Sequence, residues 1–337
     1  MSLFQNKDIA LAFSKYLRAG NAAALWLDYR RSLLRRRVII NNYPPAVMIE
    51  PTNICNLHCP LCPSGNNSLK RARGAMSYEL FCTIVDEIYR KVGMLILWNQ
   101  GEPFVNPAFI DMIRYASNKD LYTMTSTNAS LELDCEAIVQ SGLNKIIISM
   151  DGVSEATYNQ YRVNGNYNLV LENMKSLVKA KRDFSKSKPL IVWQFIIMRQ
   201  NEHEIEQVKR MAKDIGVDKL DFKTVQIYTR DDLHFLPTDH HLSRYMAEEK
   251  HFELKTRLLN RCRRLWTQPV INWDGELSIC CYDKDLSFRI GNISENSFAA
   301  LWQGPAMNRI RRQILQNRAK YEICRNCGEG IVQKLRL

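Results

Sequence analysis

The sequence contains no hydrophobic stretch that approaches the ~20 residues needed by a membrane-spanning helix. It also lacks the apolar core of a secretory signal peptide near its N-terminus, and it has no internal repeat and no low-complexity tract. These absences argue against a membrane-spanning protein, a secreted protein and a repeat protein. With 337 residues, of which 46% are hydrophobic, the chain is expected to be a cytoplasmic globular protein with a large core.

Disulfides are not expected either, because the ten cysteines lie in a chain without a secretion signal. Cys55, Cys59 and Cys62 share one tight loop in the run Glu-Pro-Thr-Asn-Ile-Cys-Asn-Leu-His-Cys-Pro-Leu-Cys-Pro. A closed structural zinc site would need a fourth ligand nearby. The next cysteine, Cys82, lies within a helical pattern. Three thiolates on a 4Fe–4S cluster instead leave one iron open to a substrate or cofactor.

The C-x3-C-x2-C spacing of these three cysteines resembles the signature of the radical S-adenosylmethionine (SAM) superfamily. The resemblance implies that the amino and carboxylate groups of SAM bind the open iron. It also implies that the reduced cluster cleaves SAM to methionine and a 5′-deoxyadenosyl radical, which abstracts a hydrogen atom from a substrate. The chain is therefore expected to be an enzyme that uses SAM and a 4Fe–4S cluster.

From residue 46 onward, short β-rich runs alternate with helical patterns. The expected strands are Val47–Glu50, Met94–Trp98, Tyr122–Ser126, Lys145–Met150, Leu190–Ile197 and Leu220–Val225, with helices near 77–92, 106–118, 133–142, 166–183 and 201–214. This alternation predicts an α/β fold with a parallel sheet and helices outside it, but does not distinguish an open sheet from a barrel. The family resemblance implies a partial (β/α)6 TIM-like barrel, with the cysteine loop after the first strand. In either architecture, active sites lie at the C-terminal ends of the strands.

The expected second strand ends in Trp-Asn-Gln-Gly-Glu-Pro, and glycine followed by Glu-Pro favours a turn with exposed carbonyls. In the radical SAM family, a Gly-Gly-Glu-Pro stretch accepts hydrogen bonds from the SAM amino group. Here Gln100 replaces the first glycine, whereas Gly101, Glu102 and Pro103 match the family pattern. The resemblance thus assigns these four residues to SAM binding, although the same motif also occurs in ordinary turns.

Four further residues are assigned to SAM by the same resemblance. Asn128 and Ser149 would lie near the ribose and methionine parts, and Arg162 would neutralise the SAM carboxylate. Leu61 occupies a position where many family members place an aromatic residue against adenine, so it keeps an apolar contact without stacking. Strand-end caps and turn residues are the alternative roles for these polar side chains.

A second set of cysteines begins where the strand–helix alternation stops, after about residue 255. It comprises Cys262, Cys280, Cys281, Cys324 and Cys327. Asp274 and Gly275 between two β-like runs predict a hairpin, which would return Cys280 toward Cys262. Two of these cysteines and the compact pair at 324 and 327 would suit either zinc or a 4Fe–4S cluster.

This segment resembles the SPASM/twitch extensions of radical SAM enzymes, because Cys262, Gly275 and Cys280 fit their opening pattern C-x9–15-G-x4-C. The spacing is most similar to the shorter twitch form of aminocyclitol dehydrogenases. The resemblance implies one auxiliary 4Fe–4S cluster with Cys262, Cys280, Cys324 and Cys327 as ligands. Cys281 is left over as an alternative ligand, a buried bystander or a reactive thiol. The expected domains are a helical segment at 1–43, the partial barrel at 44–240 and the extension at 255–337.

The formal charge of +12 comes largely from two basic segments, near residues 30–37 and 309–320. Solvated helix faces explain most of it, and an anionic substrate or an acidic electron donor, such as flavodoxin or ferredoxin, would explain the rest. Nucleic acid is not an expected partner. The helical pattern of residues 1–40 favours a cap packed on the barrel over a helix on a membrane surface.

The leading functional hypothesis is oxidation of a small polar substrate, such as a cyclitol, sugar or sugar nucleotide, with the auxiliary cluster as electron acceptor. Asp221 and Lys223, on one face of the sixth strand, are candidates for the base that takes the proton. A redox-neutral epimerase would instead use Cys281 as a hydrogen-atom donor. A ribosomal-peptide maturase is a third enzyme hypothesis, and residues 1–45 are short and helical for a leader-binding domain. An iron–sulfur electron carrier and a zinc-stabilised nucleic-acid binder are the non-enzyme alternatives.

Overall fold

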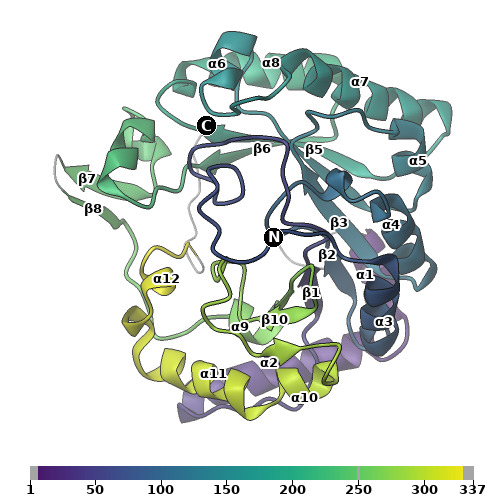
Figure 1. Cartoon of the computed structure of the whole chain (residues 1–337), viewed down its shortest axis with the longest axis vertical. Coiled ribbons are helices and arrows are strands. Elements are labelled where there is room, and N and C mark those ends of the chain that lie inside the picture. Colours follow the sequence, from purple (N-terminus) through teal and green to yellow (C-terminus); the bar gives the residue numbers. More distant parts are fainter. Residues whose placement is uncertain (1–6, 249–250, 329–337) are drawn as a thin grey trace. The chain divides into compact units, whose positions relative to one another are not determined.

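The computed structural model describes residues 7–248 and 251–328, in which helices and strands alternate (Figure 1). These residues form two compact units. Unit 1 is built from three stretches that are far apart in the sequence, residues 7–54, 69–124 and 258–328. Unit 2 contains residues 55–68, 125–248 and 251–257. The first cysteine loop belongs to unit 2, and the second cysteine set belongs to unit 1.

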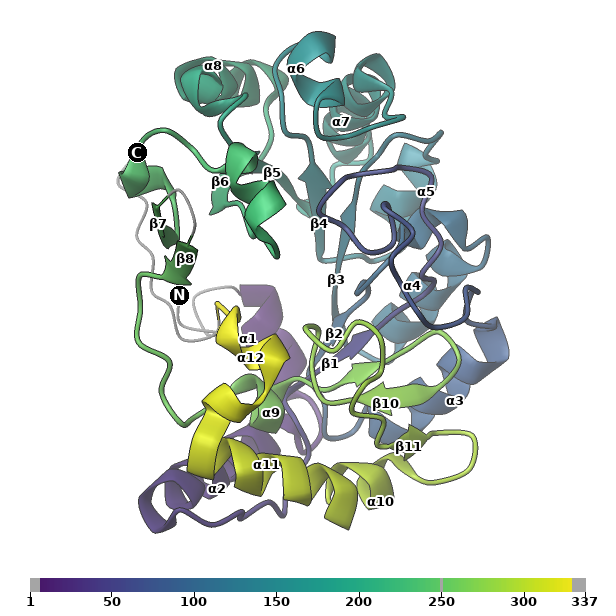
Figure 2. The ribbon, with the colours of Figure 1, turned by 60° about the vertical axis from the view of Figure 1, so that its left-hand side comes forward.

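The sheet of unit 1 combines strands from both ends of the chain. Its order is β11 (Gly291–Asn292), β10 (Glu276–Ser278), β9 (Val270–Ile271), β1 (Ala46–Ile49), β2 (Met94–Ile96) and β3 (Tyr122–Thr127). Strand β1 pairs in parallel with β2 on one side and with β9 on the other. The predicted hairpin is β9–β10, and it extends the sheet beyond β1, so that β10 and β11 lie beside the first strands (Figure 2).

Two helices of unit 1, α3 and α10, begin with side-chain caps that their sequences provide. Ser77 accepts a hydrogen bond from the N–H of Leu80 at the start of α3, and Ser297 does the same for Ala300 at the start of α10. The helices are α3 (Tyr78–Ile88), α4 (Phe109–Asn118), α9 (Arg264–Thr267), α10 (Phe298–Trp302), α11 (Pro305–Asn317) and α12 (Glu322–Arg325).

Two N-terminal helices, α1 (Lys7–Ser14) and α2 (Arg18–Arg35), also belong to unit 1. Ala12 of α1 is buried in one cluster with apolar side chains of strands β1, β2, β3 and β9. Arg18 is fully buried, and its guanidinium donates hydrogen bonds to the carbonyls of Ala12, Tyr89 and Lys119. These helices therefore pack on the sheet as a cap. None of the described helices is long and apolar enough to span a membrane.

Unit 2 contains the C-terminal part of β3, followed in the sheet by β4 (Lys145–Ser149), β5 (Leu190–Ile197) and β6 (Lys219–Thr224). Strands β4, β5 and β6 are parallel neighbours, so all six predicted strands are present. The helices are α5 (Cys135–Gln140), α6 (Glu155–Asn159), α7 (Tyr167–Asp183) and α8 (Ile205–Ile215). A small antiparallel hairpin, β7 (Tyr245–Glu248) and β8 (His251–Leu254), was not predicted.

Replacement of Arg18 by Met should lower the free energy of unfolding by about 2–4 kcal/mol, because several buried carbonyls would lose a charged donor. Urea unfolding followed by circular dichroism measures this change. Arg35→Met is the matched control, because Arg35 is exposed in the same pair of helices. Equal stability of both variants would contradict the anchoring role of Arg18.

Candidate functional site

The cysteine loop (Cys55–Cys62) is a compact turn in unit 2. The N–H of Cys62 donates to the carbonyl of Cys59, and the N–H of Gly65 donates to the carbonyl of Cys62. A Cβ on Gly65 would lie 2.6 Å from the backbone nitrogen of Cys59, so a larger side chain would displace the loop. Leu57 and Leu61 are buried in an apolar cluster with side chains that follow β5 and β6. The loop is therefore stabilised both by its backbone hydrogen bonds and by the packing of its leucines.

Hydrogen-bond donors point at two of the three thiols. Nη1 of Arg162 lies 3.9 Å from Sγ of Cys59, and Nδ2 of Asn128 lies 3.7 Å from Sγ of Cys55. Burial raises the pKa of the Cys59 thiol, and the Arg162 cation opposes this increase. Donors in these positions stabilise thiolates and, once a cluster is bound, its sulfur atoms.

Arg162 is itself neutralised by a buried carboxylate. Its Nη2 lies 2.6 Å from Oδ2 of Asp151, which is fully buried and also accepts a hydrogen bond from the N–H of Ile196. The predicted contact of Arg162 with a SAM carboxylate remains a prediction, and in this structure its ion-pair partner is Asp151. Sequence analysis gave Asp151 no role.

Other predicted residues of unit 2 share one face of its sheet. Register pairs Ser149 with Gln194 and Gln194 with Asp221, and paired residues project to the same side of a parallel sheet. Ile196 pairs with Lys223 and packs against the apolar cluster of the cysteine loop. Nζ of Lys223 is 2.8 Å from Oδ2 of Asp221. The face that carries these polar groups is therefore the one that the cysteine loop covers.

In unit 1, the turn after β2 is shaped by Gly101. Its φ is +74°, and a Cβ there would lie 2.6 Å from the carbonyl oxygens of Thr52 and Ile54. The N–H of Glu102 donates to the carbonyl of Ile54, the residue directly before Cys55. Pro103 begins a short 3-10 helix. The predicted SAM-binding turn is thus tied to the strand end from which the cysteine loop leaves.

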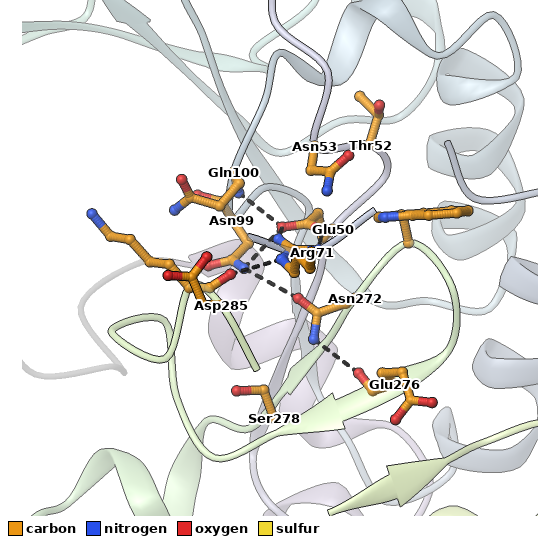
Figure 3. Close-up of polar contacts among 12 residues, drawn as sticks. Glu50, Thr52, Asn53, Arg71, Asn99, Gln100, Asn272, Glu276, Ser278 and Asp285 are labelled. Carbon is orange, nitrogen blue, oxygen red and sulfur yellow. Dashed lines mark hydrogen bonds and ion pairs between the residues drawn. The ribbon is translucent and has the colours of Figure 1, made fainter. Parts of the chain in front are cut away.

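A buried ion pair lies beside this turn (Figure 3). Glu50 is fully buried at the end of β1, and both of its carboxylate oxygens accept hydrogen bonds from Arg71, at 2.7 and 2.6 Å. One oxygen also accepts from Nδ2 of Asn99 and from the N–H of Gln100. Burial raises the pKa of Glu50, and the hydrogen bonds from Arg71 oppose the increase. The network fixes the backbone of the predicted SAM-binding turn at Gln100.

Arg71 also reaches the C-terminal segment of unit 1. Its Nε donates to the carbonyl of Lys284 at 2.7 Å, and the N–H of Lys70 donates to Asp285 at 2.8 Å. Sequence analysis did not select Glu50 or Arg71. The sequence does show a carboxylate, Glu50, at the end of an apolar strand and five residues before Cys55. That position alone does not indicate a role, because the partner Arg71 cannot be identified from the sequence.

Four cysteines of the second set lie together in unit 1. Burial raises the pKa of the Cys280 thiol well above its ordinary value, and the nearby thiols of Cys281, Cys262 and Cys327 raise it further. The N–H of Cys327 donates to the carbonyl of Cys324, so these two residues form one turn. The predicted ligands of the auxiliary cluster are therefore brought to one place.

Cys281 has different surroundings from its neighbour Cys280. Its Sγ accepts a hydrogen bond from Nη1 of Arg264 at 2.9 Å. It packs against the apolar cluster that contains Met48, Ile96 and Val270 of the sheet. This arrangement favours Cys280 over Cys281 as a ligand, and leaves Cys281 facing the strands.

Both cysteine sets offer thiols, which are the usual ligands of iron–sulfur clusters. In a 4Fe–4S cluster each thiolate binds a different iron, so the ligands stand further apart than around one zinc ion.

Two family models match the chain. Residues 49–212 match the Radical SAM superfamily, and residues 262–328 match a SPASM domain, described as an iron–sulfur cluster-binding domain. The chain is 24% identical over 317 residues to the tungsten-containing aldehyde ferredoxin oxidoreductase cofactor-modifying protein of Pyrococcus furiosus, covering 83% of this chain and 86% of that protein. It is 29% identical over 223 residues to a PqqA peptide cyclase of Bradyrhizobium diazoefficiens, covering 64% of this chain and 57% of that protein.

Among solved structures, BtrN in complex with AdoMet and 2-DOIA has a similar fold. The TM-score is 0.54 at 15% sequence identity, and the match covers 88% of this chain and 97% of BtrN. The match supports the predicted α/β fold with a parallel sheet.

Gly101→Ala should destabilise the protein by about 1–3 kcal/mol and weaken SAM binding, because an alanine at this positive φ would clash with two backbone oxygens. Urea unfolding and equilibrium dialysis with labelled SAM measure the two effects. Gly20→Ala is the matched control, since Gly20 lies in α2 with nothing within 4 Å of the added carbon. An unchanged SAM affinity in Gly101→Ala would contradict the assignment of this turn to SAM.

Proposed function

Because the chain belongs to the radical SAM superfamily and carries a SPASM-type cluster-binding domain, we propose that it oxidises a small polar substrate, such as a cyclitol, sugar or sugar nucleotide. Cys55, Cys59 and Cys62 would hold the 4Fe–4S cluster that, with SAM, would supply the 5′-deoxyadenosyl radical for hydrogen-atom removal. An auxiliary cluster held by the second cysteine set would accept one electron. A base takes one proton, so the substrate loses two electrons and two protons in total. An external one-electron donor, such as flavodoxin or ferredoxin, would reduce the first cluster.

The observation that carries this proposal is the number of thiols at each site. The cysteine loop contributes three, at Cys55, Cys59 and Cys62, which leaves one iron open for SAM. The second set provides a fourth thiol, so every iron of the auxiliary cluster has a protein ligand and none is left for the substrate. A closed cluster of this kind supports electron transfer.

The chain's own residues would bind the substrate and take its proton. The face of the unit 2 sheet that carries Ser149, Gln194 and Asp221 offers hydroxyl, amide and carboxylate groups to a polyhydroxylated molecule. Asp221 is the candidate base, and Nζ of Lys223 lies 2.8 Å from its carboxylate. The likeness to the cofactor-modifying protein of Pyrococcus furiosus supports a substrate that is not a peptide.

A second candidate function is peptide modification, which the likeness to the PqqA peptide cyclase favours. A third is epimerisation with Cys281 as hydrogen-atom donor. Its support is that Cys281 faces the strands of unit 1 and is hydrogen-bonded to Arg264. In that reaction the substrate radical gains the hydrogen atom from the thiol, and the product keeps the oxidation state of the substrate.

The protein reconstituted under anaerobic conditions should contain about eight irons per chain and form 5′-deoxyadenosine from SAM when reduced with dithionite. Replacement of Cys55, Cys59 and Cys62 by Ala together should leave about four irons and abolish 5′-deoxyadenosine formation. Iron analysis and chromatography measure both. A wild-type chain with about four irons, or without 5′-deoxyadenosine, would falsify the proposal.

Cys281→Ala distinguishes oxidation from epimerisation. If the product is oxidised, this variant should keep forming it, because Cys281 is not a ligand and transfers no hydrogen atom. Cys82→Ala, on helix α3, is the control for loss of a cysteine elsewhere in unit 1. The measurement uses a sugar substrate in deuterated water. If Cys281→Ala, but not Cys82→Ala, loses both product formation and deuterium incorporation, the result would support the epimerase.

A further inference from the structure

Arg318 is a buried cation whose donors lack ordinary acceptors. It begins a short 3-10 helix, η6 (Arg318–Lys320), between α11 and α12, and it is 3% exposed. Its Nη1 donates to the carbonyl of Arg261 at 2.9 Å. Neither Nε nor Nη2 has a nitrogen or oxygen acceptor among the described residues. Buried, charged donors without partners are costly, so such a side chain needs an explanation.

The groups around this guanidinium are cysteine thiols. The N–H of Tyr321 donates to the carbonyl of Arg318, and the N–H of Cys324 donates to the carbonyl of Tyr321, so consecutive backbone turns connect Arg318 to Cys324. The thiols of Cys262, Cys327 and Cys324 all interact electrostatically with the guanidinium. The carbonyl that holds Nη1 belongs to Arg261, the residue before Cys262. No carboxylate in the described part of the chain forms an ion pair with Arg318. Among the described residues, its guanidinium therefore faces the second cysteine set and the carbonyl of Arg261.

Two other arginines with little exposed surface have different partners from Arg318. Arg162 also approaches a cysteine of the first loop, but Asp151 neutralises it at 2.6 Å. Arg311 lies over the ring of Trp302 at 4.0 Å, and burial alone lowers its pKa to about 9. Among the buried arginines of the described residues, Arg318 is thus the one that faces cysteine thiols and has no carboxylate partner.

We propose that Arg318 tunes the auxiliary cluster, with its Nε and Nη2 donating to cluster sulfur atoms, so that this cluster accepts an electron more readily. The inference rests on the proposed function, because it requires a cluster at Cys262, Cys280, Cys324 and Cys327. One added electron makes the cluster more negative by one charge. A cation and its hydrogen bonds, buried away from water, stabilise that reduced form and raise the reduction potential.

An auxiliary cluster that accepts one electron would also complete the oxidation of the substrate. The substrate radical gives one electron to the auxiliary cluster and one proton to a base, and becomes a closed-shell product. The first loop, where the arginine is neutralised, lacks this stabilisation of extra negative charge. We therefore expect the auxiliary cluster to have the higher reduction potential. The first cluster, with the lower potential, would give its electron to SAM, and the auxiliary cluster would accept one from the substrate.

The test is a redox titration of the reconstituted full chain, monitored by electron paramagnetic resonance. It is carried out in the background in which Cys55, Cys59 and Cys62 are Ala, so that only the auxiliary signal remains. Arg318→Met should make the one-electron reduction at least about tenfold less favourable, which corresponds to a potential lower by about 59 mV. Arg318→Lys should show a smaller shift, because it keeps the charge but loses the planar fork of donors. Lys320→Met, an exposed cation in the same turn, should show none.

Iron and sulfide analysis of each variant separates the possible failures. A full auxiliary cluster with an unchanged potential in Arg318→Met overturns the tuning role alone. Loss of the auxiliary irons from both Arg318 variants also overturns it, and makes Arg318 a residue of assembly. A wild-type chain that holds only the first cluster's irons overturns the proposed function, and this inference with it.

Discussion

The buried ion pair of Glu50 and Arg71 is the interaction on which both cysteine motifs depend. The chain leaves unit 1 after Ile54 to form the cysteine loop and returns at residue 69, so the pair holds the two crossings together. The same guanidinium holds the carbonyl of Lys284, four residues after Cys280. Desolvation of two charges is costly, and it is offset here by hydrogen bonds to every oxygen of the carboxylate. Loss of either partner would leave the other charge buried and uncompensated.

The two cysteine sets have different electrostatic surroundings, although an arginine lies near the sulfur atoms of each. Each arginine also has a partner outside the set: Asp151 for Arg162 and the carbonyl of Arg261 for Arg318. The difference is the carboxylate of Asp151, which balances Arg162 and has no equivalent beside Arg318 among the described residues. A single acidic residue at the end of β4 therefore separates a site that is electrically balanced from one that attracts negative charge.

Sequence predicted the features that depend on local patterns. These are the six strands and the hairpin at Asp274-Gly275, since hydrophobic period and turn residues are visible in one sequence. It could not predict the contacts that join distant segments. Arg71 meets Lys284 across more than two hundred residues, and Arg318 is informative only because Arg261 and the thiols surround it. Such contacts follow from packing, and arginines in a basic chain are too numerous for one to be selected beforehand.

The parallel pairing of β9 with β1 has a consequence for how this protein arose and how it can be divided. Met48 and Ile49 of β1 lie in register with Val270 and Ile271 of β9 on one side, while β2 occupies the other. Without residues 262–328, the strand that leads into the cysteine loop would become an open edge, with unpaired amides available to another chain. The C-terminal segment is therefore not a removable accessory, and a shortened protein would be prone to self-association. Gain or loss of such a segment in evolution would require a replacement for the missing strand at the same position.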